Sequence, residues 1–168
     1  MFNIFKSGKN KTKAESDNGG TLSAVADGEL IPITDVPDQV FSQKILGDGY
    51  AILPSSGSIV SPVSGTVTEV YDTGHAYCIT SGDGLEILVH IGIDTVELKG
   101  NGFSAIVGKG DKVLRNSPIA VANIELIKSL GYKTFTMVVI TNPLTVKSLT
   151  LTKEKHIRAG DTALTYKL

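Results

Sequence analysis

The chain has 168 residues, a formal net charge of −1 and a single cysteine. This length suffices for one domain with a buried core, the near-neutral charge gives no indication of a nucleic-acid partner, and one cysteine excludes an internal disulfide framework. No apolar run approaches the ~20 residues that cross a bilayer as a helix, and the N-terminus lacks the apolar segment and cleavage site of a signal peptide. We therefore expect a cytoplasmic protein.

Residues 1–20 read as a lysine-rich leader, in which lysines alternate with small polar residues. We expect this leader to be flexible and solubilising. Phe2, Ile4 and Phe5 lie beside the lysines, so a weak contact with anionic lipid is the alternative. The apolar part is too short for stable membrane insertion. Residues 21–168 then form one folded domain.

Short runs of valine, isoleucine and threonine, separated by Gly, Asp, Asn and Pro, recur from Thr21 onward and predict an all-β domain. The segments 26–33 (ADGELIPI) and 63–70 (VSGTVTEV) resemble one another, and so do 108–114 (GKGDKVL) and 158–164 (RAGDTAL). These repeats indicate a duplicated, hybrid-type β motif. Paired units that close on each other predict an antiparallel β-sandwich or barrel.

One or two short helices are expected in this domain. Ile124, Ile127 and Leu130 are spaced three residues apart, Asn123 can cap the start of this helix, and Gly131 can end it. A second helical turn is predicted within 38–44, directly after a proline.

Two of the three histidines, His75 and His90, lie on either side of a glycine-rich turn. A two-residue turn at Gly82-Asp83 pairs His75 with His90, and a turn at Asp83-Gly84 puts Tyr77 opposite His90 and His75 on the diagonal. Both registers bring the imidazoles together, whereas a β-bulge or an odd-length loop would remove this inference. The face opposite His90 would carry an apolar row for the core, formed by Leu85, Ile87, Val89 and Ile91.

Three interpretations of the histidine pair stay open on the residues alone. The two side chains are ordinary surface histidines, or they bind zinc, or they transfer a phosphoryl group. Zinc needs three or four ligands, so Asp94 or a partner's carboxylate would have to join. In phosphoryl transfer, a neutral imidazole nitrogen attacks phosphorus while the second imidazole donates to the phosphoryl oxygens, and no metal is required. His156 lies in a charged, surface-like stretch and is expected to be incidental.

The sequence around His90 resembles a known signature. Residues 84–96, GLEILVHIGIDTV, look like the signature of glucose-type IIA components of the phosphoenolpyruvate-dependent sugar phosphotransferase system. The match continues through 97–100 and 102–103, and upstream through Val36-Pro37-Asp38, Phe41, 47–49, 62–63 and 65–66. It covers roughly residue 21 to the C-terminus. The resemblance indicates a stand-alone form of this component (type 1 EIIA), without fused IIB and IIC parts.

The resemblance implies an antiparallel all-β fold and a phosphohistidine intermediate at His90, formed on its outer ring nitrogen. His75 would stabilise the phosphoryl group, and Thr73 matches the family residue that orients His75. The donor would be the phosphocarrier HPr, and the acceptor a cysteine on a IIB domain of a sugar permease. The inner nitrogen of His90 must then hold its proton on a fixed acceptor, for which we expect a backbone carbonyl near Gly92. No cofactor is implied, although His75 and His90 could share zinc with a partner's carboxylate.

The resemblance also implies a surface for these partners. Asp38 and Asp94 match the family acids that pair with an arginine of HPr, although aspartate also forms turns and helix caps. An exposed apolar docking patch is expected around the histidines, at Val40, Phe41, Tyr71, Leu88 and Val96.

The family often has phenylalanine at the positions of Tyr71, Cys78 and Leu88, so these departures could alter which IIB domains dock. If Cys78 and Leu88 both face the partner, the ideal ladder with His75 opposite His90 cannot hold throughout. A bulge between His75 and Cys78 would reconcile the two.

Three other classes were compared with this assignment. A zinc endopeptidase of bacterial cell walls needs an H-x-H pair, but His90 is followed by Ile91-Gly92. A biotinyl or lipoyl carrier needs a lysine at an exposed hairpin tip, and the turn at Gly82-Asp83 has none. A regulatory binding module that responds to phosphorylation would use the same surface, and the sequence leaves it open.

Overall fold

The computed structural model describes residues 19–142 and 146–168. The leader predicted over residues 1–20 lies outside this range except for its last two residues, so its flexibility and lipid contact stay predictions. No helix of the described residues has both the length and the apolar character needed to cross a membrane.

The described residues form mostly antiparallel strands, as predicted. In chain order the elements are β1 (Gly20–Ser23), β2 (Gly28–Pro32), η1 (Ile33–Asp35), α1 (Gln39–Ser42), β3 (Asp48–Pro54), β4 (Ser58–Val60), β5 (Gly65–Val70), β6 (Ala76–Ser81), β7 (Glu86–Ile91), η2 (Thr95–Leu98), β8 (Phe103–Ala105), β9 (Lys112–Val113), β10 (Pro118–Ala122), α2 (Ile124–Ser129), β11 (Thr136–Ile140), β12 (Ser148–Leu151), β13 (His156–Ile157) and β14 (Thr162–Lys167).

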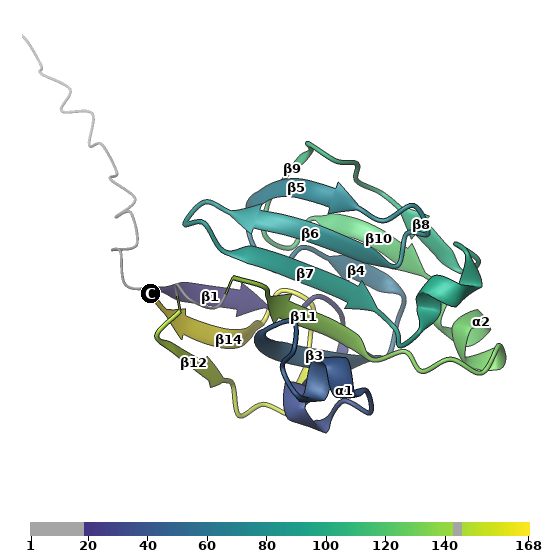
Figure 1. Cartoon of the computed structure of the whole chain (residues 1–168), viewed down its shortest axis with the longest axis horizontal. Coiled ribbons are helices and arrows are strands. Elements are labelled where there is room, and N and C mark those ends of the chain that lie inside the picture. Colours follow the sequence, from purple (N-terminus) through teal and green to yellow (C-terminus); the bar gives the residue numbers. More distant parts are fainter. Residues whose placement is uncertain (1–18, 143–145) are drawn as a thin grey trace, which may run out of the picture.

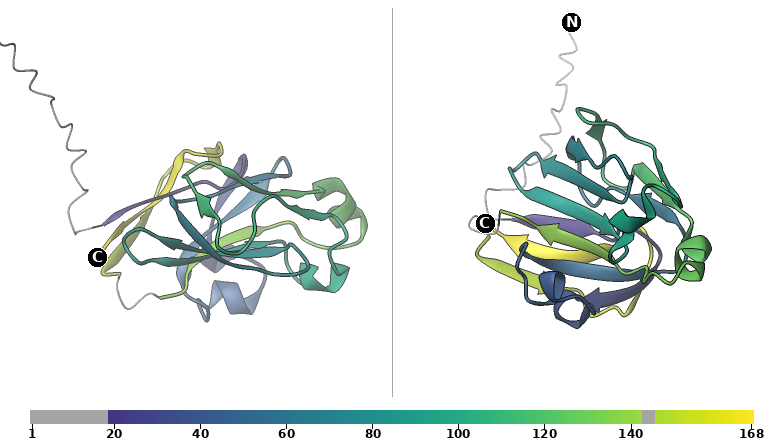
Figure 2. Two further views of the ribbon diagram at one scale, coloured as in Figure 1. Left: turned by 90° about the horizontal axis from the view of Figure 1, so that it is seen from above. Right: turned by 45° about the vertical axis from the view of Figure 1, so that its right-hand side comes forward.

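A large sheet and two small ones enclose the core. The eight-stranded sheet has the order β13-β2-β3-β11-β7-β6-β5-β9, and the three-stranded sheets have the orders β1-β14-β12 and β4-β10-β8. In Figure 1, β4 and β10 lie behind β6 and β7, and α2 lies at one end of the molecule. The two turned views of Figure 2 show the same layered arrangement. The predicted antiparallel β-sandwich with two short helices is confirmed.

The first predicted repeat is confirmed in register. β2 pairs with β13 so that Gly28 is opposite Ile157, and β5 pairs with β9 so that Gly65 is opposite Val113. Gly28 and Gly65 are also the equivalent positions of the sequence segments 26–33 and 63–70. The equivalent strands β2 and β5 are therefore each paired with a two-residue edge strand.

The second predicted repeat is out of register. The amide of Ala24 donates to the Asp161 carbonyl, and in the other copy the amide of Ser61 donates to the Ser117 carbonyl. The segment 158–164 therefore corresponds to 114–120 and not to 108–114. The error has a physical origin, because the turn at 108–111 and the turn at 158–161 each use an aspartate carboxylate to accept from an amide three residues earlier. The two segments have similar sequences because their turns use the same hydrogen bond, although they do not occupy equivalent positions in the two copies of the motif.

Both helices begin and end as expected. Asn123 caps α2 by accepting from the Leu126 amide, and Gly131 follows the helix with φ +90°. Asp38 caps α1 by accepting from the Val40 amide. α1 covers part of the outer face of the large sheet (Figure 1).

Two apolar clusters lie on opposite faces of the large sheet. The main cluster contains the predicted row Leu85, Ile87, Val89 and Ile91, which is confirmed as core. The smaller cluster lies on the face of Leu88 and includes residues of α1, β3, β6 and β11. Because side chains alternate along β7, His90 shares the face of Leu88 and the smaller cluster. The site therefore lies on the outer face of the sheet.

Candidate functional site

The hairpin that positions the histidines has a three-residue loop. Ser81 and Leu85 flank Gly82, Asp83 and Gly84, the Ser81 amide donates to the Leu85 carbonyl at 2.9 Å, and Gly84 has φ +89°. A glycine in the left-handed region is typical of three-residue hairpins. This odd-length loop shifts the pairing by one residue, so both predicted registers are wrong.

Ala76, and neither His75 nor Tyr77, is opposite His90. Cys78 is directly opposite Leu88, so both share the face of His90 without a bulge in this ladder. The bulge predicted between His75 and Cys78 is therefore wrong. A register shift is found instead on β5, between Val67 and Glu69.

A turn just before β6 brings His75 to the same face. Gly74 has φ +69°, and its amide donates to the Tyr71 carbonyl at 2.7 Å. His75 still joins the sheet through its carbonyl, which accepts from the Ile91 amide at 2.7 Å. The rings of His75 and His90 have centroids 5.0 Å apart and planes at 81°. The predicted meeting of the two imidazoles is confirmed, although by a turn and not by strand pairing.

The inner nitrogen of His90 is fixed as predicted. Nδ1 lies 2.8 Å from the carbonyl oxygen of Gly92. A carbonyl can only accept, so Nδ1 carries the proton and donates it. The neutral ring therefore keeps a free lone pair on Nε2, which is the nitrogen that can attack an electrophile.

The loop after β7 holds this carbonyl in place. Gly92 has φ +79°, and its amide donates to the Phe135 carbonyl at 2.9 Å. The Thr95 hydroxyl donates to the Ile91 carbonyl, and a Cβ on Gly92 would lie 2.3 Å from the Thr95 methyl carbon. Thr95 was not singled out from the sequence. A threonine four residues after a strand end gives no local indication that it fills the space beneath a glycine.

His75 is held by Thr73 and enclosed by aromatic rings. The Thr73 hydroxyl is hydrogen-bonded to Nδ1 of His75, as the resemblance implied for these positions. Tyr71 and Phe103 lie with ring centroids 5.6 Å and 6.4 Å from that of His75, and His75 is buried. When the hydroxyl donates to Nδ1, the proton of neutral His75 is on Nε2, where it can be donated to an anion.

Burial keeps both imidazoles neutral. It lowers the pKa of His75, and it lowers the pKa of His90 to about 4, with the nearby His75 as a second cause. The Gly92 carbonyl and the Asp38 carboxylate act in the opposite direction on the pKa of His90. At neutral pH, His90 is therefore a neutral imidazole with a proton on Nδ1 and a free lone pair on Nε2.

The two predicted acidic residues lie near the pair. Asp38 is half-buried, caps α1 at 2.9 Å from the Val40 amide, and its charge acts on His90. Asp38 therefore caps the helix and also lies close enough to His90 for its charge to act on that ring. Asp94 is exposed at φ +58°, and the part of the chain that the structure describes contains no ion pair to it.

The expected apolar patch divides into an exposed and a buried part. Val40, Tyr71 and Val96 are 42%, 46% and 52% exposed, and we call these three the apolar rim. Phe41 and Leu88 are only 6% and 8% exposed, so the prediction that they are exposed is wrong. They pack in the smaller cluster, and the Phe41 ring lies 5.2 Å from the His90 ring.

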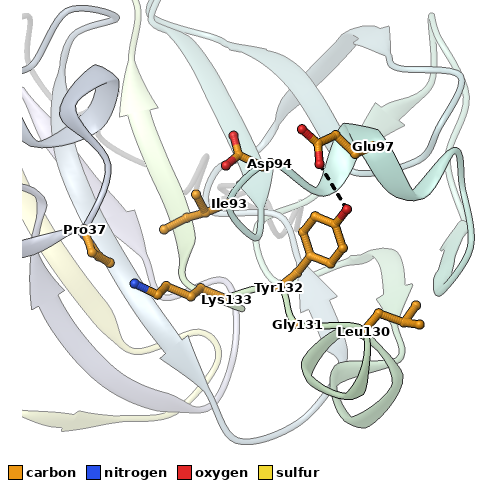
Figure 3. Close-up of a pocket in the computed structure, with 8 residues that line it drawn as sticks. All are labelled: Pro37, Ile93, Asp94, Glu97, Leu130, Gly131, Tyr132 and Lys133. Atoms are coloured by element: carbon orange, nitrogen blue, oxygen red, sulfur yellow. Dashed lines mark hydrogen bonds between the residues drawn. The ribbon is translucent and has the colours of Figure 1, made fainter.

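A cavity adjoins this face at Asp94 (Figure 3). It has a volume of about 430 Å³ and is lined by Pro37, Ile93, Asp94, Glu97 and residues 130–133. The Tyr132 hydroxyl donates to the Glu97 carboxylate at 3.0 Å, and this bond raises the pKa of Tyr132. Two carboxylates and the Lys133 ammonium therefore line this cavity.

His156 is exposed on the edge strand β13, where it is opposite Glu29 and separated from the pair by several strands. Within 19–142 and 146–168, no group of three or more His, Cys, Asp or Glu side chains converges as a metal site would require. A zinc ion shared with a partner's carboxylate stays a prediction.

Comparison with known proteins decides the family. The family model described as "phosphoenolpyruvate-dependent sugar phosphotransferase system, EIIA 1" matches residues 20–146. The chain belongs to this EIIA family. Its members are components of the phosphotransferase system for sugar transport, as the resemblance around His90 indicated.

Curated relatives of the family cover most of the chain. The glucose-specific EIIA component of Halalkalibacterium halodurans is 39% identical over 164 residues, which are 98% of this chain and 94% of that protein. The glucose-specific EIICBA component of Streptococcus pneumoniae is 45% identical over 136 residues, which are 81% of this chain and 19% of that protein. The chain thus spans about a fifth of the latter relative.

A solved structure of the family has the same fold. The glucose permease IIA of Mycoplasma capricolum is 32% identical, with a TM-score of 0.79, and the match covers 88% of this chain and 95% of that one. The antiparallel β-sandwich is therefore the fold of this EIIA family.

Proposed function

We propose that this EIIA family member carries a phosphoryl group on Nε2 of His90, taking it from phospho-HPr and passing it to a cysteine of a IIB domain. The observation that carries the proposal is the hydrogen bond from Nδ1 of His90 to the Gly92 carbonyl at 2.8 Å. Relatives named as glucose-specific components support a glucose-type permease as the recipient.

In the first step, the Nε2 lone pair attacks the phosphorus of the phosphohistidine of HPr. A new N–P bond forms on His90 as the N–P bond of the donor breaks, and the donor imidazole keeps the bonding electron pair. Such transfers pass through a loose transition state, so the protein acts mainly by positioning and by stabilising charge. The fixed Nδ1 proton and the pKa of about 4 keep Nε2 ready for this attack.

His75 donates to the phosphoryl oxygens on His90 and is required for the second step. Its ring centroid lies 5.0 Å from that of His90, and when the Thr73 hydroxyl donates to Nδ1, the proton of His75 is on Nε2. In the second step, a thiolate of the IIB domain attacks phosphorus, an S–P bond forms, and the N–P bond on His90 breaks. The phosphoryl group adds nearly two negative charges to a half-buried site, and this favours its departure.

The surface around the pair supports docking of both partners. The apolar rim of Val40, Tyr71 and Val96 is exposed, while Asp38 and Asp94 carry negative charge beside it. An arginine of HPr would pair with these two carboxylates, and charge complementarity of this kind mainly raises the rate and specificity of association.

Labelling with phosphoenolpyruvate, enzyme I and HPr tests the proposal. We expect the wild-type chain to acquire acid-labile phosphate, His90→Ala to acquire none, and His156→Ala to label like wild type. We expect His75→Gln to accept phosphate but to fail in passing it to a IIB domain. Persistent labelling of His90→Ala would contradict the assignment of the phosphorylated residue.

A further inference from the structure

A groove remote from His90 combines an apolar half with a cationic half. The apolar half is a cavity of about 320 Å³ whose lining includes Leu53, Lys128, Thr134 and Phe135. The cationic half is a neighbouring cavity of about 540 Å³ that shares Leu53 and Lys128 with the first. The two cavities therefore lie side by side between β3, α2 and β13, and we call them together the Thr134 groove.

A buried hydroxyl in the apolar half lacks a partner. Thr134 is 2% exposed, and its hydroxyl makes no hydrogen bond to any residue in the described part of the chain. An unpaired buried polar group costs free energy and is uncommon in folded proteins. Leu53 and Phe135 are half-buried beside it, so this half offers an apolar surface over an unsatisfied buried hydroxyl, and Lys128 and Lys133 also line it.

The cationic half carries positive groups that are not neutralised. Lys128 and Arg158 line it, and neither side chain has an ion pair or hydrogen bond within 19–142 and 146–168. His156 lines this half as well. Two carboxylates also line this half, but both have partners.

Asp27 accepts from the Ala159 amide at 2.8 Å, and Glu29 lies 3.4 Å from the Lys155 ammonium. The unpaired charges in this half are therefore positive.

We propose that the Thr134 groove binds a small organic anion with an apolar body and one phosphate or carboxylate group. The body would lie on Leu53 and Phe135, and movement of these half-buried side chains on binding would give the buried Thr134 hydroxyl a hydrogen-bond partner. The anionic group would lie between Lys128 and Arg158. An apolar surface with a few convergent polar groups is the usual composition of a small-molecule site, and the volume of each cavity is in the usual range.

The groove is linked to the phosphoryl site through the backbone. The Phe135 carbonyl accepts from the Gly92 amide at 2.9 Å, and the Gly92 carbonyl accepts from His90. Occupation of the groove should therefore be detected at the Gly92 amide, although that residue does not line it.

Benzyl phosphate is a suitable probe, titrated into the unphosphorylated ¹⁵N-labelled chain without any partner protein. We expect saturable shifts of the Thr134, Phe135 and Ile157 amides, with a smaller shift at Gly92. Benzyl alcohol lacks the charge and inorganic phosphate lacks the ring, so each should bind at least about tenfold more weakly.

Three variants separate the groove from a general charge effect. Thr134→Val should weaken benzyl phosphate about fivefold, and Arg158→Gln should weaken it about tenfold. Lys112→Gln, which removes a lysine on β9 at the far edge of the large sheet, should bind like wild type. Thr134→Val should also unfold at an unchanged or higher urea concentration, because it removes an unpaired buried group.

Three outcomes would overturn the proposal. They are shifts that centre on His90, equal affinity for benzyl phosphate and inorganic phosphate, and unchanged binding by Thr134→Val. Because no phosphoryl transfer is measured, failure here leaves the role of His90 untouched.

Discussion

Nδ1 of His90 lies 2.8 Å from the carbonyl oxygen of Gly92. This hydrogen bond determines which ring nitrogen holds the proton, and therefore which one can react. The loop that presents the carbonyl is itself held by the backbone of residues 133–135, since the amides of Gly92 and Ile93 donate to the carbonyls of Phe135 and Lys133. The carbonyl that holds the Nδ1 proton is thus positioned by residues just before β11, which are distant from it in the sequence.

Gly92→Ala should lower the free energy of unfolding by about 2–3 kcal/mol, because its φ of +79° is strained for alanine and the new Cβ would lie 2.3 Å from the Thr95 methyl carbon. Gly110→Ala is the matched control. Its φ is +92°, but a Cβ there meets nothing within 4 Å, so only about 1 kcal/mol should be lost. Urea unfolding measures both, and equal losses would contradict the steric argument.

Protonation of His90 should occur well below neutral pH. Its pKa is lowered from 6.5 to about 4 by burial, so phosphoryl acceptance should stay nearly constant from pH 7 to pH 5.5 and fall as the pH approaches 4. A ¹⁵N-histidine NMR titration measures the midpoint directly. A midpoint near 6.5 for His90 would contradict the proposed environment.

The same shift gives a pH dependence of stability. Between the folded pKa of about 4 and the unfolded value of 6.5, the unfolded chain binds more protons at His90 than the folded chain does. The free energy of unfolding should therefore decrease as the pH falls from 6.5 toward 4, by a few kcal/mol at most. His90→Gln should reduce this decrease. The pKa of His75 is also lowered, so His75 would account for part of the pH-dependent loss of stability that remains in His90→Gln.

Thr73→Val should slow the transfer from phosphorylated His90 to a IIB domain by about two- to tenfold, the effect of one net hydrogen bond. The reason is that His75 loses the hydroxyl that orients its ring. Thr73→Ser retains this hydroxyl and should restore most of the rate. Rapid-quench measurements of the two transfer steps separate this effect from a loss of acceptance. Equal rates for Val and Ser would contradict the orienting role.

Val96→Asp should reduce kcat/KM for phospho-HPr by about tenfold or more, because it places a charge in the apolar rim. Leu114→Asp is the control, since Leu114 is 71% exposed but lies beyond β9, away from His90. Both variants should unfold like wild type. A similar reduction in both would indicate a general charge effect and not a docking surface.

Much of the fold follows from local patterns. The alternation of apolar residues along 85–91 predicted which face of β7 enters the core, Asn123 marked the start of α2, and the position after Pro37 indicated α1. These features depend on residues close in the sequence. The register of the hairpin was predicted wrongly, because Gly82-Asp83-Gly84 permits a two- or a three-residue loop and the sequence does not distinguish them.

The proximity of Thr73, His75 and His90 was predicted, whereas the arrangement of the residues around them was predicted only in part. Phe41 and Leu88 were expected at the surface but are buried, because the fold places α1 against the sheet and creates a second apolar cluster there. Thr95 was missed because its contact with Gly92 depends on the path of the loop.

The sequence by itself determined the β class, the helix caps, and a signature around His90 specific enough to indicate the family. Each of these is encoded by neighbouring residues, whose propensities and hydrogen bonds act over a few positions. Only the tertiary structure decided that His75 meets His90 through the Gly74 turn and that Phe135 supports the Gly92 carbonyl. These contacts join segments far apart in the chain, and their geometry is set by packing of the whole sheet.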